Sequence, residues 1–547
     1  MSGIRRTTML TESGNSQCDR IVQWQLPVQT KSLCPICHEV ISAQLVEDQG
    51  RVMMHKSCVN HGDFVELISS DAEFFMKMRR VHYERPRAVT NPQRRNISHC
   101  PDECGLCDEH LSSPTMVNID LTNRCNQNCP ICFANSNVEG RICELTLEQV
   151  KRILDAAASM KPRRAACLQF VGGEPTIHGD FVQCVREAAQ RGFSHIQAAT
   201  NGVRFAKDAA FAQAASDAGL GQVYLQFDGL DDDVYMQTRH RALVETKLAA
   251  VENIRKANMR IVLVPTIVKG INDRQVGVIT RFAMENTDVI SAISWQPVSI
   301  TGRIDEQKRR QMRYTLADLA KDLQEQLGFM DMHRDWWPFS IVSPFLRLMA
   351  AVTGQEQISM SCHPHCGAAT YLVVDNQKKE AVPLPAFVDM EAAMAELDKM
   401  AARIEKYPLL KKMTVVSAIK VMRKYFDAEQ APKGWGFGEF SEFIKSFVEF
   451  SEQHDDRRSM INNLREERFA TLLMAAMHFQ DVYNYEIDRS KHCVILYAAP
   501  NGRFYPFCTW NSGPCHRNHV EKAYSRALTP IGERSSKAGT RQSATVV

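Results

Sequence analysis

The chain has 547 residues, and its 66 lysines and arginines nearly balance 63 aspartates and glutamates, which leaves a net charge of +3. That balance offers no basic stripe for nucleic acid, and the proportions of hydrophobic (44%) and charged (24%) residues exclude a mostly disordered chain. The longest nearly apolar run, residues 259–268, contains Arg260 and is about half the length that spans a bilayer. The first residues also lack the apolar core of a secretory signal, so we expect a cytoplasmic protein of about three or four domains.

The 18 cysteines are the informative part of the composition. They are too dilute for a disulfide scaffold, in which cysteine exceeds about 8–10% of a short secreted chain. Most of them fall in short clusters, and clustered cysteines without an export signal indicate metal or iron–sulfur ligation in a reducing compartment.

The first cluster predicts a small site for one metal ion. Cys34 and Cys37 form one pair of ligands, and Cys58 with His61 forms a second pair about twenty residues further along the chain. This spacing is typical of a closed structural site with three thiolates and one imidazole, which holds zinc or a rubredoxin-like iron. His55 competes with His61 for the fourth position, and free thiols on a small β unit are the alternative.

The second cluster, Cys100, Cys104 and Cys107, has the spacing Cys-x3-Cys-x2-Cys. Three thiolates on one loop can bind three irons of a [4Fe–4S] cluster, and we favour such an auxiliary cluster over zinc. The fourth ligand is not evident from the sequence; Cys143 and an exogenous ligand are the candidates.

An α/β rhythm begins near residue 112 and ends near residue 301. Strand-like segments alternate there with amphipathic helical segments, an order that predicts parallel strands in βα units. Six units are too few for the complete eightfold barrel but fit a partial (βα)6 barrel, with its chemistry at the C-terminal ends of the strands. The expected strands are residues 115–122, 166–173, 195–202, 222–229, 260–268 and 290–299, and the expected helices are residues 145–160, 180–192, 207–219, 245–258 and 274–286.

The same cysteine spacing recurs directly after the first of these strands, as Cys125, Cys129 and Cys132. Three thiolates leave the fourth iron of a cluster without a protein ligand, and an open metal position is where a substrate or cofactor binds. A three-cysteine zinc knuckle is the alternative. At the end of the next strand, glycines allow the backbone to approach a ligand and a glutamate can accept hydrogen bonds from an ammonium group, in the turn Gly172-Gly173-Glu174-Pro175.

These motifs resemble the hallmark of the radical S-adenosylmethionine (SAM) superfamily over about residues 112–300. The resemblance implies that the three cysteines bind a [4Fe–4S] cluster whose open iron is chelated by SAM, and that reduction yields a 5′-deoxyadenosyl radical that abstracts a substrate hydrogen. It also implies a low-potential electron donor such as ferredoxin or flavodoxin. Ile131 stands where the family usually has an aromatic residue, and Phe133 follows the third cysteine.

The resemblance also implies a set of cofactor contacts at the strand ends. Each implied contact beyond the turn at residues 172–175 could instead belong to an ordinary turn. The implied contacts are Gly172, Gly173 and Glu174, with Pro175 in the same turn, for the methionine amine, and Thr200, Asn201, Gln226, Asp228 and Gln296 for the ribose, carboxylate and adenine.

Two further cysteine patches lie far apart in the C-terminal half. Strands around both patches could bring Cys362, Cys366, Cys493 and Cys508 together as a second auxiliary [4Fe–4S] cluster. Cys515 competes for the last position, and two unrelated patches are the alternative.

The stretch 335–349 carries two of the six tryptophans and is interrupted by two prolines, so it cannot form one regular helix. A segment of this kind is usually core between domains; otherwise it lines an apolar channel or rests on a membrane surface. We expect Trp336, Trp337, Phe339 and Phe345 to line part of an apolar tunnel.

Most of residues 31–515 resembles the tetraether lipid synthase group within the superfamily, through the motifs NRCNQNCPICFANS, CHPHCG and YPFCTWNSGP. This resemblance implies hydrogen abstraction from the end of an alkyl chain, joining of lipid chains by a carbon–carbon bond, and contact with the inner face of a membrane. A radical SAM methyltransferase acting on a pterin-like small molecule, or a peptide maturase, is the runner-up. An iron–sulfur electron-transfer protein is the non-enzymatic alternative.

These features divide the chain into eight segments. We expect a flexible arm over 1–30, a rubredoxin-like knuckle over 31–70, a linker with an auxiliary cluster over 71–111, the radical SAM core over 112–310, a helical segment with a cysteine patch over 311–395, a helical region over 396–480, a C-terminal auxiliary cluster region over 481–520 and a disordered tail over 521–547.

Overall fold

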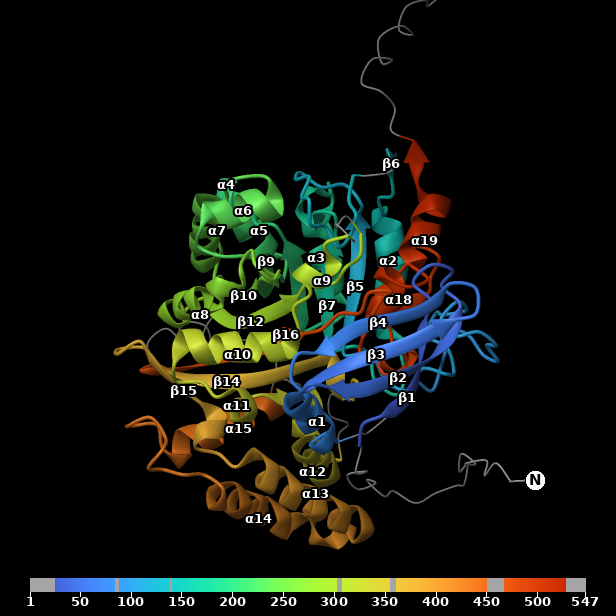
Figure 1. The fold of residues 1–547 in the computed structure, drawn as a ribbon. Helices are drawn as coiled ribbons and strands as arrows, with labels where there is room; N and C mark the ends of the chain where they lie inside the picture. The colour runs from blue at the N-terminus through green and yellow to red at the C-terminus, as the bar shows by residue number, and fades with distance from the viewer. Residues whose placement is uncertain are drawn as a thin grey trace, which may run out of the picture.

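The computed structural model describes residues 25–83, 88–137, 140–302, 307–354, 361–449 and 467–527 (Figure 1). Most of the expected arm and tail, residues 1–24 and 528–547, lies outside the described residues. The described remainder contains regular elements: β1 (Val28–Leu33) starts inside the expected arm, and α19 (His516–Tyr524) and β19 (Arg526–Ala527) extend into the expected tail. The predicted disorder is therefore wrong for these parts, because β1 pairs with β2 and β19 pairs with β6 (Arg141–Ile142).

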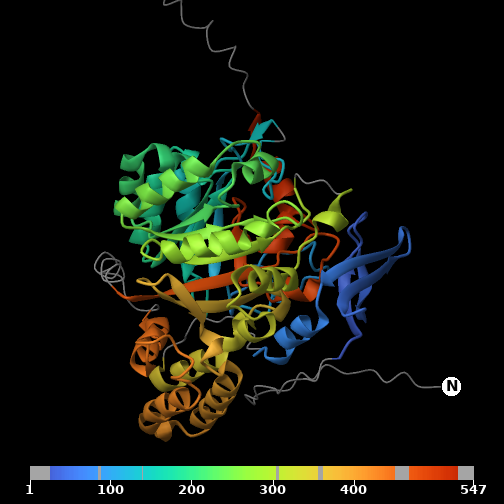
Figure 2. The same ribbon diagram turned by 60° about the vertical axis from the view of Figure 1, so that its left-hand side comes forward.

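The N-terminal unit is an antiparallel sheet in the order β1-β2-β3-β4. Buried and exposed residues alternate along β3, the pattern of a sheet with one packed face. The helix α1 (Ala72–Arg80) follows, and its N-cap Asp71 accepts a hydrogen bond from the Phe74 N–H at 2.6 Å. The strands of this sheet after β1 are β2 (Val40–Asp48), β3 (Arg51–Cys58) and β4 (Gly62–Ser69). The four-stranded sheet and α1 lie beside the larger sheet that contains the barrel strands (Figures 1 and 2).

The predicted partial barrel is confirmed, and the fold is α/β. Its six strands run parallel in chain order, namely β5 (Met116–Thr122), β7 (Cys167–Gly172), β8 (His195–Thr200), β9 (Gln222–Gln226), β10 (Arg260–Val264) and β12 (Ile290–Pro297). Alternate residues such as Leu168 and Phe170 are fully buried in the largest hydrophobic cluster. That cluster includes residues of the outer helices, which are α2 (Leu147–Ala158), α3 (Phe181–Gln190), α5 (Ala209–Asp217), α7 (Val244–Lys256) and α8 (Val276–Glu285).

Short elements follow several strand ends, where the sequence shows no periodic pattern, namely α4 (Val203–Lys207), α6 (Asp232–Arg239) and β11 (Thr266–Ile267). Two further short helices, α9 (Arg309–Met312) and α11 (Met332–Asp335), lie in the part of the chain after β12.

C-terminal strands extend the barrel sheet at both edges. β16 (Phe469–Met477) lies parallel to β12, and β17 (Ile495–Ala498) lies parallel to β5, so residues 478–494 lead from one edge to the other. The prediction of helices up to residue 480 is wrong at β16, because its residues alternate between buried and half-buried as a strand's do. The sheet continues through β14 (Gly367–Asp375) to β13 (Trp337–Pro338) and β15 (Glu380–Pro383) on one side, and to β18 (Phe504–Pro506) on the other.

A helical region packs against this extension, at the end of the molecule away from α4–α7 (Figures 1 and 2). Trp336 is 1% exposed and belongs to the barrel core, and Trp337 is 9% exposed and belongs to the helical core. The stretch is therefore core between barrel and helices, rather than the expected tunnel wall. No helix in the described ranges is long and apolar enough to span a bilayer. The helical region comprises α12 (Ser343–Thr353), α13 (Met390–Lys406), α14 (Lys411–Lys424) and α15 (Phe437–Glu449). By contrast, α10 (Leu316–Leu327) packs against α8 and belongs to the barrel core (Figure 1).

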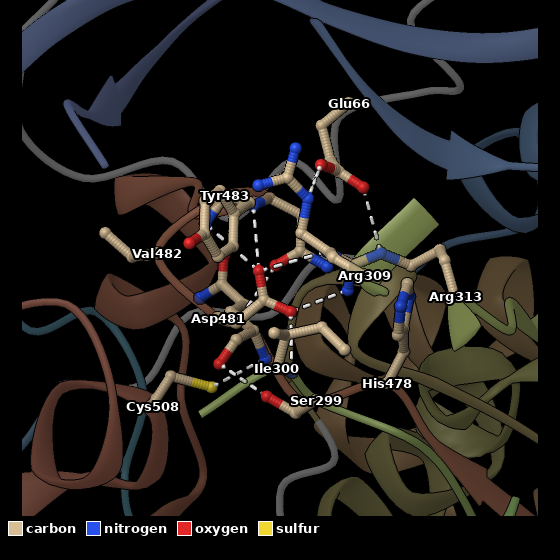
Figure 3. A network of polar contacts seen from close by, with 12 residues as sticks. Glu66, Ser299, Ile300, Arg309, Arg313, His478, Asp481, Val482, Tyr483 and Cys508 are labelled. Atoms are coloured by element: carbon tan, nitrogen blue, oxygen red, sulfur yellow. Dashed lines mark hydrogen bonds and ion pairs between the residues drawn. The ribbon is translucent and has the colours of Figure 1, made fainter. Parts of the chain in front are cut away.

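A buried ion network fastens the N-terminal sheet to the segment between β16 and β17 (Figure 3). Arg313 donates from Nε to Glu66 of β4 at 3.0 Å, and its Nη1 and Nη2 donate to the two oxygens of Asp481 at 2.6 and 3.2 Å. All three side chains are at most 4% exposed. Because a buried charge without its partner is costly, this network fixes the N-terminal sheet to the segment that leads across the barrel sheet.

Candidate active site and metal centres

The N-terminal sheet gathers four metal-ligating side chains at its turns. The ligand atoms of Cys34, Cys37, Cys58 and His61 all lie within 4.8 Å of one another, and Nδ1 of His61 is 3.5 Å from the sulfurs of both Cys34 and Cys58. His55, the rival candidate, lies exposed on β3 opposite Gln44 and outside this group. Three sulfurs and one imidazole at this spacing fit a single zinc or iron ion.

The local backbone prepares these thiols for a metal. The Cys34 N–H donates to the Glu39 carbonyl at 2.9 Å, and the Ile36 N–H points at the Cys34 sulfur at 3.5 Å. Burial opposes ionisation of Cys34, but the N–H groups of Cys37 and Ile36 outweigh it and lower the pKa of this thiol to about 7. Ionised thiols are the ligand form that metals bind.

The loop after β5 carries Cys125, Cys129 and Cys132 at the C-terminal edge of the barrel. The Asn137 side chain accepts from the Cys125 N–H and donates to its carbonyl, each at 3.0 Å, which holds the start and the end of the loop together. Burial raises the pKa of Cys125 to about 12, and the neighbouring Cys129 and Cys132 contribute to the rise. The thiols thus lie near one another, and binding a metal would require them to lose their protons.

The two glycines at the end of β7 pack against the base of this loop. A side chain at Gly172, whose φ is +139°, would lie 2.3 Å from the Thr122 carbonyl oxygen, and one at Gly173 would lie 2.2 Å from that of Arg124. The N–H groups of Gly173 and Glu174 donate to these two carbonyls at 2.7 and 2.9 Å. The motif therefore fixes the first residues of the cysteine loop, whatever ligand it also binds.

The Glu174 carboxylate is directed into the protein. It is 1% exposed and accepts four hydrogen bonds, from the N–H and hydroxyl of Thr176, the hydroxyl of Thr200 and the N–H of Asn201, at 2.6 to 3.1 Å. Asn201 in turn donates to Asn126 at 2.7 Å, next to Cys125 in the loop. Glu174 thus joins the ends of β7 and β8 to the cysteine loop, and its contact with a methionine amine stays a prediction.

A buried lysine that the sequence reasoning missed supports two of the expected cofactor contacts. Lys247 of α7 donates from Nζ to the Asn201 carbonyl and to Gln226 Oε1, both at 2.7 Å. Burial lowers the pKa of Lys247 to about 7. With Oε1 engaged, the amide nitrogen of Gln226 is buried and has no hydrogen-bond partner among the described residues. This nitrogen is a donor available to a cofactor.

The last two expected contacts lie on the adjoining strands. Asp228, two residues after the end of β9, is fully buried and accepts a hydrogen bond from Arg239 Nε at 2.7 Å. Gln296, in β12, pairs with Thr266 of β11. The structure therefore brings these residues to the same edge of the barrel as the cysteine loop.

The auxiliary cysteines also gather. Burial raises the pKa of Cys493, and the nearby Cys508 and Cys366 contribute to the rise. Cys366 likewise contributes to the raised pKa of Cys362. These interactions indicate that the four cysteines lie near one another, with Cys362 and Cys366 just before β14, Cys493 just before β17 and Cys508 in α18 (Phe507–Asn511). Their shared cluster stays a prediction. Cys515 begins α19, with its sulfur 3.6 Å from the Asn511 carbonyl.

The first auxiliary set adjoins the second. The hydroxyl of Thr509, next to Cys508, lies 3.7 Å from the Cys104 sulfur, and Cys100 and Cys107 both influence the pKa of Cys104, which burial raises to about 12. Cys143 lies beside Glu521 and Arg517. Which residue completes this set stays a prediction.

An aromatic cluster joins the cysteine loop to the second auxiliary set. Phe507, next to Cys508, stacks on Phe479 with ring centroids 3.8 Å apart, and its centroid is 5.4 Å from that of Phe133, next to Cys132. The sequence showed the departure at Ile131 and Phe133 but not this contact, because Phe479 and Phe507 lie more than three hundred residues away along the chain.

Two family models match the chain. The model of the radical SAM superfamily matches residues 119–283, and the model of the HMPTM N-terminal zinc ribbon domain matches residues 26–70. The first range runs from β5 to α8 and includes both the cysteine loop and the glycine turn. The chain is therefore a radical SAM enzyme with an N-terminal zinc ribbon.

A relative defines the family more closely. The protein named 7,8-dihydro-6-hydroxymethylpterin dimethyltransferase, from Methanocaldococcus jannaschii, is 36% identical over 501 residues, which cover 91% of this chain and 96% of that protein. This chain belongs to the same family. The comparisons thus confirm the superfamily, and they favour the methyltransferase alternative over the resemblance to tetraether lipid synthases.

More distant similarities are confined to part of the chain. The GTP 3′,8-cyclase of Rhizobium etli is 25% identical over 235 residues, which cover 42% of this chain and 65% of that enzyme. Among solved structures, Streptococcus suis SuiB bound to S-adenosylmethionine is 19% identical over 40% of this chain and 48% of SuiB, with a TM-score of 0.33.

The residues present fit the cofactors of this superfamily. Three thiols on one loop leave a cluster position open, and the amide nitrogen of Gln226 is a buried donor without a partner among the described residues. The chemistry of the donor set therefore suits a [4Fe–4S] cluster at the loop and SAM at the adjoining strand ends.

Proposed function

We propose that this enzyme replaces a C–H bond of a pterin-like heterocycle by a C–CH3 bond, as a radical SAM methyltransferase. The hydrogen leaves with 5′-deoxyadenosine, the methyl group comes from the sulfonium of a second SAM, and the low-potential donor supplies one electron for each of the two SAM molecules. The single observation that carries the substrate class is the similarity to the protein named 7,8-dihydro-6-hydroxymethylpterin dimethyltransferase. This similarity extends over 91% of this chain and 96% of that protein. When bound, the cluster and SAM supply the 5′-deoxyadenosyl radical that removes hydrogen. The chain's own residues position the substrate and exclude water.

The inner face of the barrel supports a polar substrate. The residues Asn118, Gln169, Gln197 and Gln222 are register neighbours across four adjacent strands, so a row of amides crosses the sheet. Gln197 donates to Gln169 at 2.5 Å. Burying amides is costly without hydrogen bonds, and a heterocycle with N–H and C=O groups satisfies such a surface better than an alkyl chain does.

Asp120, on β5 above this row, adds an acceptor. Its Oδ2 accepts from Trp510 and Arg517, each at 2.9 Å, while its Oδ1 is buried without a hydrogen-bond partner in the described part of the chain. An unpaired carboxylate oxygen in the barrel suits a substrate that carries N–H donors.

We assign SAM to the strand ends around Gln226, Asn201 and Gln296. Because the Glu174 carboxylate already accepts four hydrogen bonds, the methionine amine falls to backbone oxygens of the turn at Gly172 and Gly173. Lys247 then acts through Asn201 and Gln226 as a positioning residue.

The remaining metal sites complete this proposal. Cys362, Cys366, Cys493 and Cys508 hold one auxiliary [4Fe–4S] cluster, and Cys100, Cys104 and Cys107 hold another. The zinc ribbon holds one zinc or iron ion in a structural role. Electrons arrive from a low-potential ferredoxin or flavodoxin.

Lipid chain coupling is the second candidate, and one surface feature favours it. In the turn between α13 and α14, the side chains of Leu409 and Tyr407 are 99% and 52% exposed. Lys406 lies over the Tyr407 ring at 5.4 Å. Exposed apolar groups flanked by lysine are typical of contact with an anionic lipid surface. In both candidate functions a C–H bond of the substrate is replaced by a C–C bond.

One experiment separates the candidates. The reconstituted enzyme is incubated without oxygen with SAM, dithionite and either 7,8-dihydro-6-hydroxymethylpterin or a lipid extract, and products are read by mass spectrometry. The proposal expects methylated pterin and a rise in 5′-deoxyadenosine that depends on the pterin. Coupled lipid chains with no change in the pterin would replace it by the second candidate.

A further inference from the structure

Arg239 is a buried cation that reaches the cysteine loop from the far end of α6. Its side chain is 9% exposed, and the next residue, His240, ends the helix with a φ of 57°. Nη1 of Arg239 donates to the Ile131 carbonyl at 3.0 Å. Ile131 lies between the second and third cysteines of the loop, so this arginine contacts the part of the loop that carries two ligands.

The guanidinium is paired with a buried carboxylate, Asp228, that accepts hydrogen bonds at both of its oxygens. Asp228 accepts from Arg239 Nε at 2.7 Å and from the Thr238 hydroxyl at 3.1 Å, both at Oδ2, while its Oδ1 accepts from the Thr266 N–H at 3.1 Å. The anchor thus combines β9, α6 and β11. A buried pair with this many hydrogen bonds offsets the desolvation of its two charges.

The guanidinium therefore places a buried positive charge at the loop itself. The carbonyl that it binds belongs to Ile131, two residues after Cys129 and directly before Cys132. A cluster bound by these two cysteines would be adjacent to that charge.

We propose that Arg239 sets the reduction potential of the cluster on Cys125, Cys129 and Cys132, by fixing one positive charge beside the loop segment between Cys129 and Cys132, and that it positions this segment through Ile131. Hydrogen bonds to ligand sulfurs and the local net charge are the protein's means of setting such potentials. A fixed cation favours the state with one more electron, so the potential is higher with Arg239 than without it. The inference rests on the cluster in the proposed function and not on the substrate.

The test compares full-length reconstituted variants by redox titration followed by electron paramagnetic resonance. Arg239→Met removes the charge, and Arg239→Lys retains it. We expect at least a tenfold fall in the ratio of reduced to oxidised cluster at a fixed potential for Arg239→Met, which is a shift of about 59 mV for one electron. Arg239→Lys should restore most of that ratio.

Arg164→Met is the matched control. Arg164 also donates to backbone carbonyls, those of Arg191 and Gly192, but it lies before the start of β7, at the other end of the strands. Its loss should leave the potential unchanged. Equal shifts in the Arg239→Met and Arg164→Met proteins would overturn the proposal, because they would reflect general loosening.

A second variant covers the case in which Arg239→Met leaves Asp228 buried and unpaired and the protein fails to fold. The double variant Asp228→Asn with Arg239→Met neutralises both charges and keeps the local net charge unchanged. Because Arg239, and not Asp228, is the group that is hydrogen-bonded to the loop carbonyl, the ratio should still fall. A fully loaded double variant with an unchanged potential would refute the inference, while a normal potential without turnover of any substrate would count only against the proposed function.

Discussion

The zinc ribbon and the radical SAM loop both present cysteines, but in two different geometries. In the ribbon, four ligand atoms lie within 4.8 Å of one another, as one ion requires. Within the described residues, Cys125, Cys129 and Cys132 form no group of that kind. A cube of four irons holds its thiolates further apart than a single ion does, and three thiolates leave one iron open.

The two sites also differ in what holds them. The ribbon ligands sit on turns closed by their own backbone hydrogen bonds, such as Cys34 to Glu39 and His61 to Cys58. The radical SAM loop is held by partners from distant elements, among them Gly173, Asn201 and Arg239. A closed site can therefore form locally, whereas the open site depends on the assembled barrel.

The largest effect is expected from the open site. Replacing Cys125, Cys129 and Cys132 together by alanine should abolish formation of 5′-deoxyadenosine, because no open iron is then left to hold SAM. Chromatography of the reduced enzyme with SAM measures this, and iron content should fall by about four per chain.

The ribbon serves as the internal control for that triple variant. Its single metal ion should remain, because none of its ligands is changed. Undiminished SAM cleavage by the triple variant would contradict the assignment of the open site.

A smaller effect is expected where the two regions are joined. Arg313→Met leaves Asp481 buried without its arginine and removes one of the two arginines paired with Glu66, the other being Arg309 at 2.9 Å. Breaking a buried pair in this way costs about 3–5 kcal/mol. Thermal unfolding of the loaded enzyme should show an earlier transition. Arg51→Met is the matched control in the same N-terminal sheet, because its pair with Asp48 is exposed on both sides (45% and 53%) and such pairs contribute about 0–1 kcal/mol. Equal loss in both variants would mean that the network does not fasten the ribbon.

Within the ribbon, two histidines distinguish a ligand from a bystander. His61→Ala should lower metal affinity by at least about tenfold, since it removes one of four ligands from a closed shell. His55→Ala should leave metal content unchanged, because that side chain lies outside the group. Competition with a chromogenic chelator measures both affinities, and the opposite order would assign the fourth position to His55.

The sequence predicted the six barrel strands because their alternation with amphipathic helices is local. It missed β16, because a short apolar run such as FATLLMAAM does not distinguish strand from buried helix without its partners. Those partners, β12 and β14, are distant in the chain.

The candidate site divides in the same way. Cysteine spacing is a local signal, and it led to the ligand sets of both the ribbon and the loop. Arg239 and Lys247 are single cations on helices, and no spacing marks them. Their importance arises only when the barrel brings α6 and α7 to the cysteine loop and to Asn201.

The smallest effect concerns the cofactor pocket beside the open site. Gln226→Leu removes the buried amide nitrogen that has no partner among the described residues, and with it the hydrogen bond that we assign to SAM. One such bond contributes about 0.5–1.5 kcal/mol, so the Kd for SAM should rise by up to about tenfold. Calorimetry under anaerobic conditions measures the change on the loaded enzyme.

Gln222→Leu is the control on the same face of β9, because Gln222 lies at the other end of the strand and donates to Ser291 at 3.0 Å. Iron content and the ribbon's metal should be unchanged in both variants, which separates a lost contact from a damaged site. If the two variants bind SAM equally well, Gln226 supports the barrel only, and the free nitrogen belongs to the substrate or to a buried water.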